Sequence, residues 1–160
     1  MNTNTKISTK CRVNSFIICD AIHIDPATGK HSILGTFSTL RVVKFPAYHR
    51  KMDWFLSLSE LHRGEHNLKI FLADPTGELE SKLLIDRDFE SPDPQHKINL
   101  VNEIRNLKVL KAIDYSIVIE VDNEIVFVDT LQVQGIEHYD EDYEDEYEDY
   151  EGFENNDSVF

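Results

Sequence analysis

The sequence is poor in cysteine and has no long hydrophobic run. Its 160 residues include 2 cysteines, Cys11 and Cys19, too few and too unevenly placed to make a disulfide framework. The longest apolar runs, such as residues 16–19, fall far short of the roughly 20 residues that cross a membrane. The polar beginning of the chain has no apolar stretch typical of a secretory signal. These features predict a cytoplasmic protein without a membrane partner.

Two larger patterns are also missing. No segment recurs with a period of about 20–50 residues, which excludes a repeat architecture. No long amphipathic helix alternates with the apolar segments, so a βαβ architecture is not expected. The length suits one domain plus a tail, and 41% hydrophobic residues are enough to build a core.

From residue 13 to residue 136 the chain is a series of short β-type segments separated by turn signals. Trp54, Leu56 and Leu58 recur with a period of two, and residues 68–72 repeat this pattern. Residues 98–110 also fit a helix, but their asparagines weaken it, and a strand is the preferred interpretation. The predicted strand segments are residues 16–24, 31–45, 53–59, 68–72, 79–85, 98–110, 115–121 and 125–133.

These segments predict an all-β fold. Gly35 marks either a β-bulge or a close backbone approach inside the second segment. Asp122 and Asn123 fit a two-residue hairpin turn. About seven or eight short strands with regular turns are typical of an antiparallel β-sandwich or barrel. We expect a flexible leader at residues 1–12, a β-sandwich domain at 13–136, and an acidic, tyrosine-rich tail at 137–160 that is disordered or folds on a partner.

Several short motifs point to a known family. They are a Cys-Asp strand at residues 18–20, a Gly-x-Phe strand at residues 33–37 and a Phe-Pro strand end at residues 45–46. Together with the turns at 25–30, 63–66 and 74–77 and the closing hairpin at 115–133, they resemble a bacterial family of small domains of unknown function. The resemblance spans roughly residues 13–134. It implies an immunoglobulin-like β-sandwich and no catalytic residue.

The net charge of −14 is unevenly distributed along the chain. Residues 1–52 contain 8 basic and 2 acidic residues, and residues 53–136 contain 8 basic and 16 acidic residues. Residues 137–160 contain 12 acidic residues and no Lys or Arg. A nearly neutral body therefore carries a polyanionic tail, and direct nucleic-acid binding is not expected because like charges repel.

The tail combines acids with regularly spaced aromatic residues. On a helix these aromatic residues would form one stripe, with acids covering the other faces. Repulsion between the acids would prevent such a helix from forming alone, so a partner would have to supply cations and an apolar groove. Three interpretations stay open: a solubilising tail, a docking segment for a basic surface, and an imitation of the nucleic-acid backbone. The predicted partner-binding residues are Tyr139, Tyr143, Tyr147, Tyr150, Phe153, Asp142 and Glu146.

A possible partner for the tail lies in the same chain. Between Asp25 and Asp53 the sequence has no acid. The tail could fold back onto this basic first third, or reach it in a neighbouring copy. The alternative is that these bases are scattered over sheet faces and edge strands, where lysine discourages aggregation. The predicted basic patch consists of Arg41, Lys44, Arg50 and Lys51.

Motifs for catalysis or metal binding are weak. His62, Glu65 and His66 match the H-x-x-E-H zinc pattern, but that pattern needs a helix, and Gly64 with flanking strands predicts a turn instead. Lys30 follows a glycine but lacks the rest of a phosphate loop. Asp86 and Asp88 are expected on a solvated strand end, without a calcium loop. No cofactor, metal or catalytic residue is predicted.

The sequence thus favours a non-enzymatic β-sandwich that binds a basic protein surface through its tail. The first alternative is a polyanion mimic that inhibits a nucleic-acid-binding protein. The second is an enzyme or metal protein whose site is assembled from scattered histidines and acids. The sequence does not specify an oligomeric state.

Overall fold

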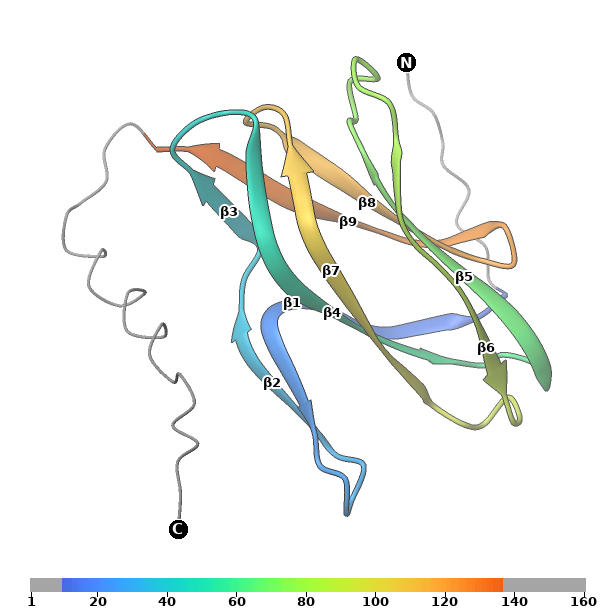
Figure 1. Cartoon of the computed structure of the whole chain (residues 1–160). Coiled ribbons are helices and arrows are strands. Elements are labelled where there is room, and N and C mark those ends of the chain that lie inside the picture. Colours follow the sequence, from blue (N-terminus) through green and yellow to red (C-terminus); the bar gives the residue numbers. More distant parts are fainter. Residues whose placement is uncertain (1–9, 137–160) are drawn as a thin grey trace, which may run out of the picture.

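The fold is a sandwich of two β-sheets (Figure 1). The structure is a computed structural model that describes residues 10–136; most of the predicted leader and the whole predicted tail lie outside these residues. The described residues form nine strands: β1 (Arg12–Ile24), β2 (His31–Thr36), β3 (Thr39–Val42), β4 (Ala47–Ser59), β5 (Gly64–Ala73), β6 (Lys82–Ser91), β7 (Ile98–Val109), β8 (Asp114–Val121) and β9 (Glu124–Gly135).

The strands are divided four and five between the sheets. One sheet has the order β2-β1-β4-β7, and the other has the order β3-β9-β8-β5-β6. The all-β prediction is confirmed, with nine strands in place of seven or eight. All pairs are antiparallel except β3 and β9, which run parallel. A β-hairpin cannot make a parallel pair, so β3 reaches β9 only because the chain crosses between the sheets.

The predicted strand at residues 31–45 is wrong, because it is two strands in different sheets. β2 pairs with β1, whereas β3 pairs with β9. At the end of β2, Gly35 has a φ of 66°, and a Cβ there would lie 2.2 Å from the Asp20 carboxylate. Gly35 therefore provides a close backbone approach as well as a left-handed conformation. The chain stays on β1 for two more residues, since Thr36 pairs with Cys19 and the Phe37 N–H donates to the Ile18 carbonyl at 3.1 Å.

Other strand boundaries also differ from the prediction. β4 begins at Ala47, directly after the cis Phe45–Pro46 peptide, and β6 runs on to Ser91. Residues 98–109 form the strand β7, as preferred from the sequence. The β8–β9 hairpin is confirmed: Asp122 and Asn123 have φ values of 51° and 63°, the left-handed conformations that a two-residue hairpin turn needs.

The hairpin formed by β1 and β2 bends away from the sandwich (Figure 1). Asp53, on the outer face of β4, accepts a hydrogen bond of 2.9 Å from the Ile22 backbone N–H at this bend. Farther along the hairpin, the His31 ring meets the Phe55 ring edge-on, with 5.4 Å between centroids. These contacts leave Asp53 only 5% exposed and fix the base of the hairpin to the sheet.

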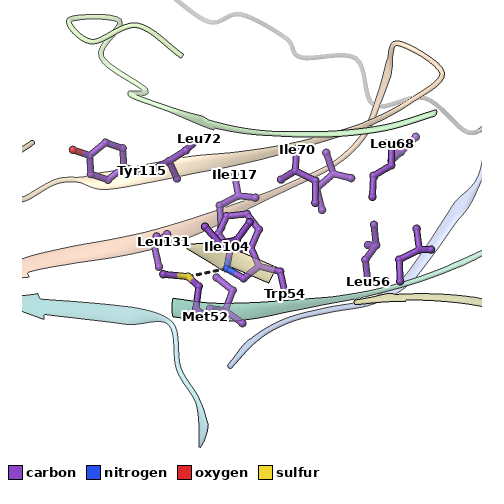
Figure 2. Close-up of a cluster of buried hydrophobic side chains, with 14 of the residues drawn as sticks. Met52, Trp54, Leu56, Leu68, Ile70, Leu72, Ile104, Tyr115, Ile117 and Leu131 are labelled. Atoms are coloured by element: carbon purple, nitrogen blue, oxygen red, sulfur yellow. Dashed lines mark hydrogen bonds between the residues drawn. The ribbon is translucent and has the colours of Figure 1, made fainter. Parts of the chain in front are cut away.

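The core lies between the two sheets, where alternate side chains of facing strands meet (Figure 2). Met52 and Trp54 point inward from β4, and Ile70 and Ile117 point toward them from β5 and β8. All four are fully buried, and each large apolar side chain contributes about 1.5–3 kcal/mol by leaving water. The Trp54 indole N–H donates to the Met52 sulfur at 2.9 Å, and the Phe16 ring packs edge-on against Trp54 at 5.6 Å.

A buried tyrosine closes the end of the sandwich between β7 and β8. The Tyr115 hydroxyl accepts hydrogen bonds from the backbone N–H groups of Leu110 (3.2 Å) and Lys111 (3.3 Å) and donates to the Lys111 carbonyl (3.3 Å). A tyrosine at the start of this strand that bonds back to the preceding loop is the tyrosine corner of immunoglobulin-like sandwiches. Together with the two-sheet arrangement, it defines the fold as immunoglobulin-like.

Replacing this tyrosine by phenylalanine tests the corner. Tyr115→Phe leaves two partly buried N–H groups and one carbonyl without their partner, and we expect it to lower the free energy of unfolding by roughly 1–2 kcal/mol. Denaturant unfolding measures the change. Tyr48→Phe is the matched control, because Tyr48 is 64% exposed and should lose almost nothing. Equal losses in the two variants would contradict the role of the corner.

The space at Gly35 gives a second test. Gly35→Ala combines a left-handed backbone with a clash against Asp20, whereas Gly29→Ala has a similar φ of 67° and open space around its Cβ. The left-handed backbone lowers the free energy of unfolding of both variants by about 1–2 kcal/mol. Only Gly35→Ala loses further stability through the clash with Asp20. Adding Asp20→Ala should therefore recover stability in Gly35→Ala and none in Gly29→Ala, as measured by thermal unfolding.

Candidate functional site

The structure does not gather the predicted basic patch on one face. Arg41 is exposed on β3, in the five-stranded sheet, and Lys44 lies in the loop that joins β3 to β4. Arg50 and Lys51 are exposed on β4, in the four-stranded sheet. The four side chains are therefore distributed around one end and one outer face of the sandwich.

Lys51 is already engaged by acids of the body. Its Nζ lies 3.3 Å from a Glu103 carboxylate oxygen and 4.0 Å from Asp53. Arg105 pairs with the same Glu103, and hydrogen bonds from Arg105 and Lys51 hold the pKa of Glu103 below its ordinary value. Lys51 is thus a poor member of a free basic patch. By contrast, Arg41, Lys44 and Arg50 form no ion pair with any residue from 10 to 136.

Pairing of β4 with β7 adds residues that sequence analysis missed. Tyr48 lies opposite Lys108, and the Lys108 ammonium is 5.7 Å from the centre of the Tyr48 ring, a cation–π contact. Large apolar side chains are exposed here and in the segments that join β3 to β4 and follow β7: Tyr48 is 64% exposed, Val43 51% and Leu110 45%. We use the name basic end for the end of the sandwich where the β3–β4 loop, the start of β4 and the end of β7 lie, which includes residues of both sheets and is not a single face. Its residues are Arg41, Val43, Lys44, Tyr48, Arg50, Lys108 and Leu110.

The described chain ends beside the basic end. β9 runs along β3, with Val42 opposite Gly135, and the Ile136 backbone N–H donates to the Val42 carbonyl at 2.9 Å. The Phe45 ring lies 3.5 Å from the place of a Cβ on Gly135. Figure 1 shows the end of β9 next to β3 and the loop that leads into β4. Ile136, to which the tail is joined, therefore lies close to Arg41 and Lys44 in the chain's fold.

The predicted partner-binding residues of the tail belong to residues 137–160, outside the described residues. The sequence of residues 137–160 contains 12 acids, no Lys or Arg, and five aromatic side chains between positions 139 and 153. The structure adds the position of Ile136, the residue to which this segment is joined.

A second surface feature is an open side of the sandwich between β1 and β9. Residues 12–18 of β1 and 124–131 of β9 have a neighbouring strand on one side only, within the described chain. A cleft of about 360 Å³ lies there, and it includes Phe16, Phe37 and Asp129. Asp129 lies opposite the fully buried Ile117, so it is on the inner face. An inward-facing charge on a strand edge opposes pairing with another strand, and we do not assign a ligand to this cleft.

The H-x-x-E-H motif does not form a zinc site. His62 lies before β5 and His66 within it, and the two rings are 4.4 Å apart. The His66 nitrogens face the Asp122 carboxylate (2.8 Å) and the His62 carbonyl (2.9 Å), so neither is available to a metal. Glu65 is exposed, whereas His66 is buried. The motif therefore fixes the loop before β5 to the β8–β9 turn.

The remaining candidates from the sequence have structural partners. The Lys30 carbonyl accepts from the Asp25 N–H and closes the β1–β2 turn. Asp86 and Asp88 lie within β6, not at its end, and both accept from the Asn67 amide. Between residues 10 and 136 no three His, Cys, Asp or Glu side chains are grouped to hold a metal. In the same range, no helix is long and apolar enough to span a membrane.

Both cysteines are buried and free. Burial, with a smaller contribution from Asp122, raises the pKa of the Cys11 thiol to about 11. Burial also raises the pKa of Cys19, and Asp53 adds to the effect. Thiols with raised pKa values stay protonated near neutral pH and are poor nucleophiles. The cysteines therefore act as small core residues.

These observations define a small immunoglobulin-like β-sandwich domain with an exposed basic end. The chain belongs to a family of unknown function (DUF6941), whose family model matches residues 14–134. The match covers the strands from β1 to β9 and stops just before the tail. No curated protein matches the chain.

Solved structures with a similar arrangement are much larger proteins. β-Glucosidase 3B from Thermotoga neapolitana, in complex with glucose, is 13% identical, with a TM-score of 0.42, over 74% of this chain and 16% of that one. The alkylpurine DNA glycosylase AlkC from Pseudomonas fluorescens, bound to DNA with an abasic site analog, is 10% identical, with a TM-score of 0.43, over 79% of this chain and 31% of that one. The chain thus spans less than a third of either protein, and these similarities carry no functional argument.

The pairing of the buried His66 with the half-buried Asp122 predicts a pH dependence of stability. Burial opposes ionisation of Asp122, but hydrogen bonds from Asn67 and His66 outweigh it, and the pKa of Asp122 is below its ordinary value of 3.8. Its stabilising contribution is complete above 3.8 and is lost as the pH falls through the lower folded value. Asp122→Asn should lower the free energy of unfolding at pH 7 by roughly 1–3 kcal/mol and remove this acid-range loss.

Denaturant unfolding between pH 7 and pH 2 measures the difference between the two proteins. Asp114→Asn serves as the control, because Asp114 is exposed and forms no hydrogen bond through its side chain within the described chain. An Asp122→Asn curve parallel to that of the unmodified protein would contradict the prediction.

Proposed function

We propose that the protein is a non-enzymatic binding module whose acidic, aromatic tail docks on a basic surface of a partner protein. The observation that carries the proposal is the position and charge of the tail. It has 12 acids without a Lys or Arg, and it follows directly from Ile136, which β3 holds by a backbone hydrogen bond. The sandwich therefore presents the tail from a fixed point.

Electrostatic and aromatic contacts would contribute to binding at different distances. The carboxylates attract a basic partner from a distance and speed association, at low salt above all. The tyrosines and Phe153 supply apolar area and stacking surfaces at close range. The body contributes a rigid scaffold with a filled core, and its two free, buried cysteines suit the cytoplasmic location that we propose.

A second candidate function is imitation of a nucleic acid. It is favoured by the absence of any Lys or Arg in the last 24 residues, which makes the tail a continuous polyanion. Such a tail would occupy a nucleic-acid-binding protein and exclude its ligand. The two functions differ in what the aromatic residues do: docking uses them, whereas imitation of a phosphate backbone depends on charge alone.

A comparative pull-down tests the proposal with three proteins: the full chain, residues 1–136, and a full chain with Tyr139, Tyr143, Tyr147, Tyr150 and Phe153 changed to Ser. Truncation after Ile136 leaves both sheets and the core intact. We expect partners that are captured at low salt by the full chain only and are released at about 1 M salt, where the Debye length is about 3 Å. Quantitative mass spectrometry identifies them.

The aromatic variant separates the alternatives, because it keeps all 12 acids. Reduced capture by this variant supports docking. Unchanged capture of nucleic-acid-binding proteins supports imitation instead. Partners that bind residues 1–136 as well as the full chain would refute both functions of the tail and assign binding to the sandwich.

A further inference from the structure

The tail and the basic end have complementary chemistry, and Ile136, the last residue described before the tail, lies next to the basic end. The basic end carries four cations, of which Arg41, Lys44 and Arg50 have no ion pair within residues 10–136 and Lys108 lies over the Tyr48 ring. From residue 26 to residue 52 the chain has no acid that would neutralise them. Val43, Tyr48 and Leu110 add exposed apolar area among these cations. A segment that combines carboxylates with aromatic rings fits such a surface.

Ile136, the residue to which the tail is joined, lies beside the basic end. Ile136 is hydrogen-bonded to Val42, which directly follows Arg41 and stands two residues before Lys44. Each further residue extends the reach by at most about 3.3–3.6 Å, so Tyr139 reaches roughly 10 Å and Tyr150 roughly 45 Å. The first acids of the tail can therefore contact Arg41 and Lys44, and the later ones can follow β4 to Arg50.

We propose that residues 137–150 dock on the basic end of the same chain and that this contact regulates the tail. The inference rests on the proposed function, because the docked tail is the segment that would otherwise bind a partner. A single exposed ion pair is weak in water. Tethering compensates for this, since a short flexible connection holds the tail at an effective concentration in the millimolar range. A partner must therefore present a stronger basic surface than the basic end in order to release the tail.

Zero-length carbodiimide cross-linking of the full chain tests the contact, because it joins only carboxylates and amines that touch. A mixture of unlabelled and ¹⁵N-labelled protein distinguishes links within one copy from links between copies. We expect tail carboxylates to be joined to Lys44 and Lys108 within one copy, roughly a hundredfold more often than between copies at about 10 μM protein. These links should disappear at about 1 M salt.

Lys97 is the internal control for cross-linking. It is exposed in the loop before β7, and this loop meets the end of β4 through the hydrogen bond from the Glu60 N–H to the Pro94 carbonyl. The basic end lies at the start of β4, whose 13 residues span roughly 43 Å. Links to Lys97 as frequent as those to Lys44, or links to Lys44 between copies only, would overturn the inference.

A pair of charge-reversal variants tests the regulation and separates it from the proposed function. Arg41→Glu with Lys44→Glu should release the tail, and polylysine-coated beads should then capture several times more full-length protein. Arg63→Glu with Lys97→Glu makes the same change of charge at the opposite end and should increase capture much less. Equal capture of the two variants overturns the inference and leaves the proposed function standing. Failure of every full-length protein to bind the beads overturns the proposed function itself.

Discussion

The structure depends on burying alternate side chains of β4 against the opposite sheet. Met52 and Trp54 fill the centre of the core, and a shift of one residue would replace them with Asp53 and Phe55. This alternation changes phase once. Asn106 in β7, with a φ of 50°, stands between Arg105, the partner of Lys51, and the buried Leu107, the partner of His49. Both strands change phase together, so the pairing continues. The change leaves two consecutive basic residues of β4 exposed, and the same constraint that fills the core therefore also shapes the basic surface.

The strands that could be predicted are those whose pattern is local. In β5 and β8 buried and half-buried residues alternate along the strand, and the turn at Asp122 and Asn123 carries its own conformational signal. The errors have nonlocal causes. Residues 31–45 divide because their partners lie in different sheets: Thr36 still pairs with Cys19 of β1, whereas residues 39–42 pair with β9. The start of β4 was missed because the change of phase at Arg50 interrupts the alternation. β6 was placed too early because much of this edge strand is exposed on both faces.

The same distinction applies to the candidate site. Sequence alone indicated an acid-free basic stretch and a polyanionic tail, because both are properties of composition. It could not show that Lys51 is held by Glu103, or that Lys108 comes to lie over Tyr48, since both contacts depend on the register between β4 and β7. It also could not place the origin of the tail. That position follows from the parallel pairing of β3 with β9, which no local pattern in residues 39–42 reveals.

The pairing of β3 with β9 has a mechanical consequence. A force that pulls on the tail along the direction of β9 acts parallel to that strand and perpendicular to its backbone hydrogen bonds. β9 is held by β8 along most of its length and by β3 at its end, so these bonds share the load and must break together. A strand at the edge of a hairpin, peeled from one end, would instead lose its bonds one at a time. The pairing of β9 therefore favours resistance to tension applied through the end of that strand, because its bonds are loaded together.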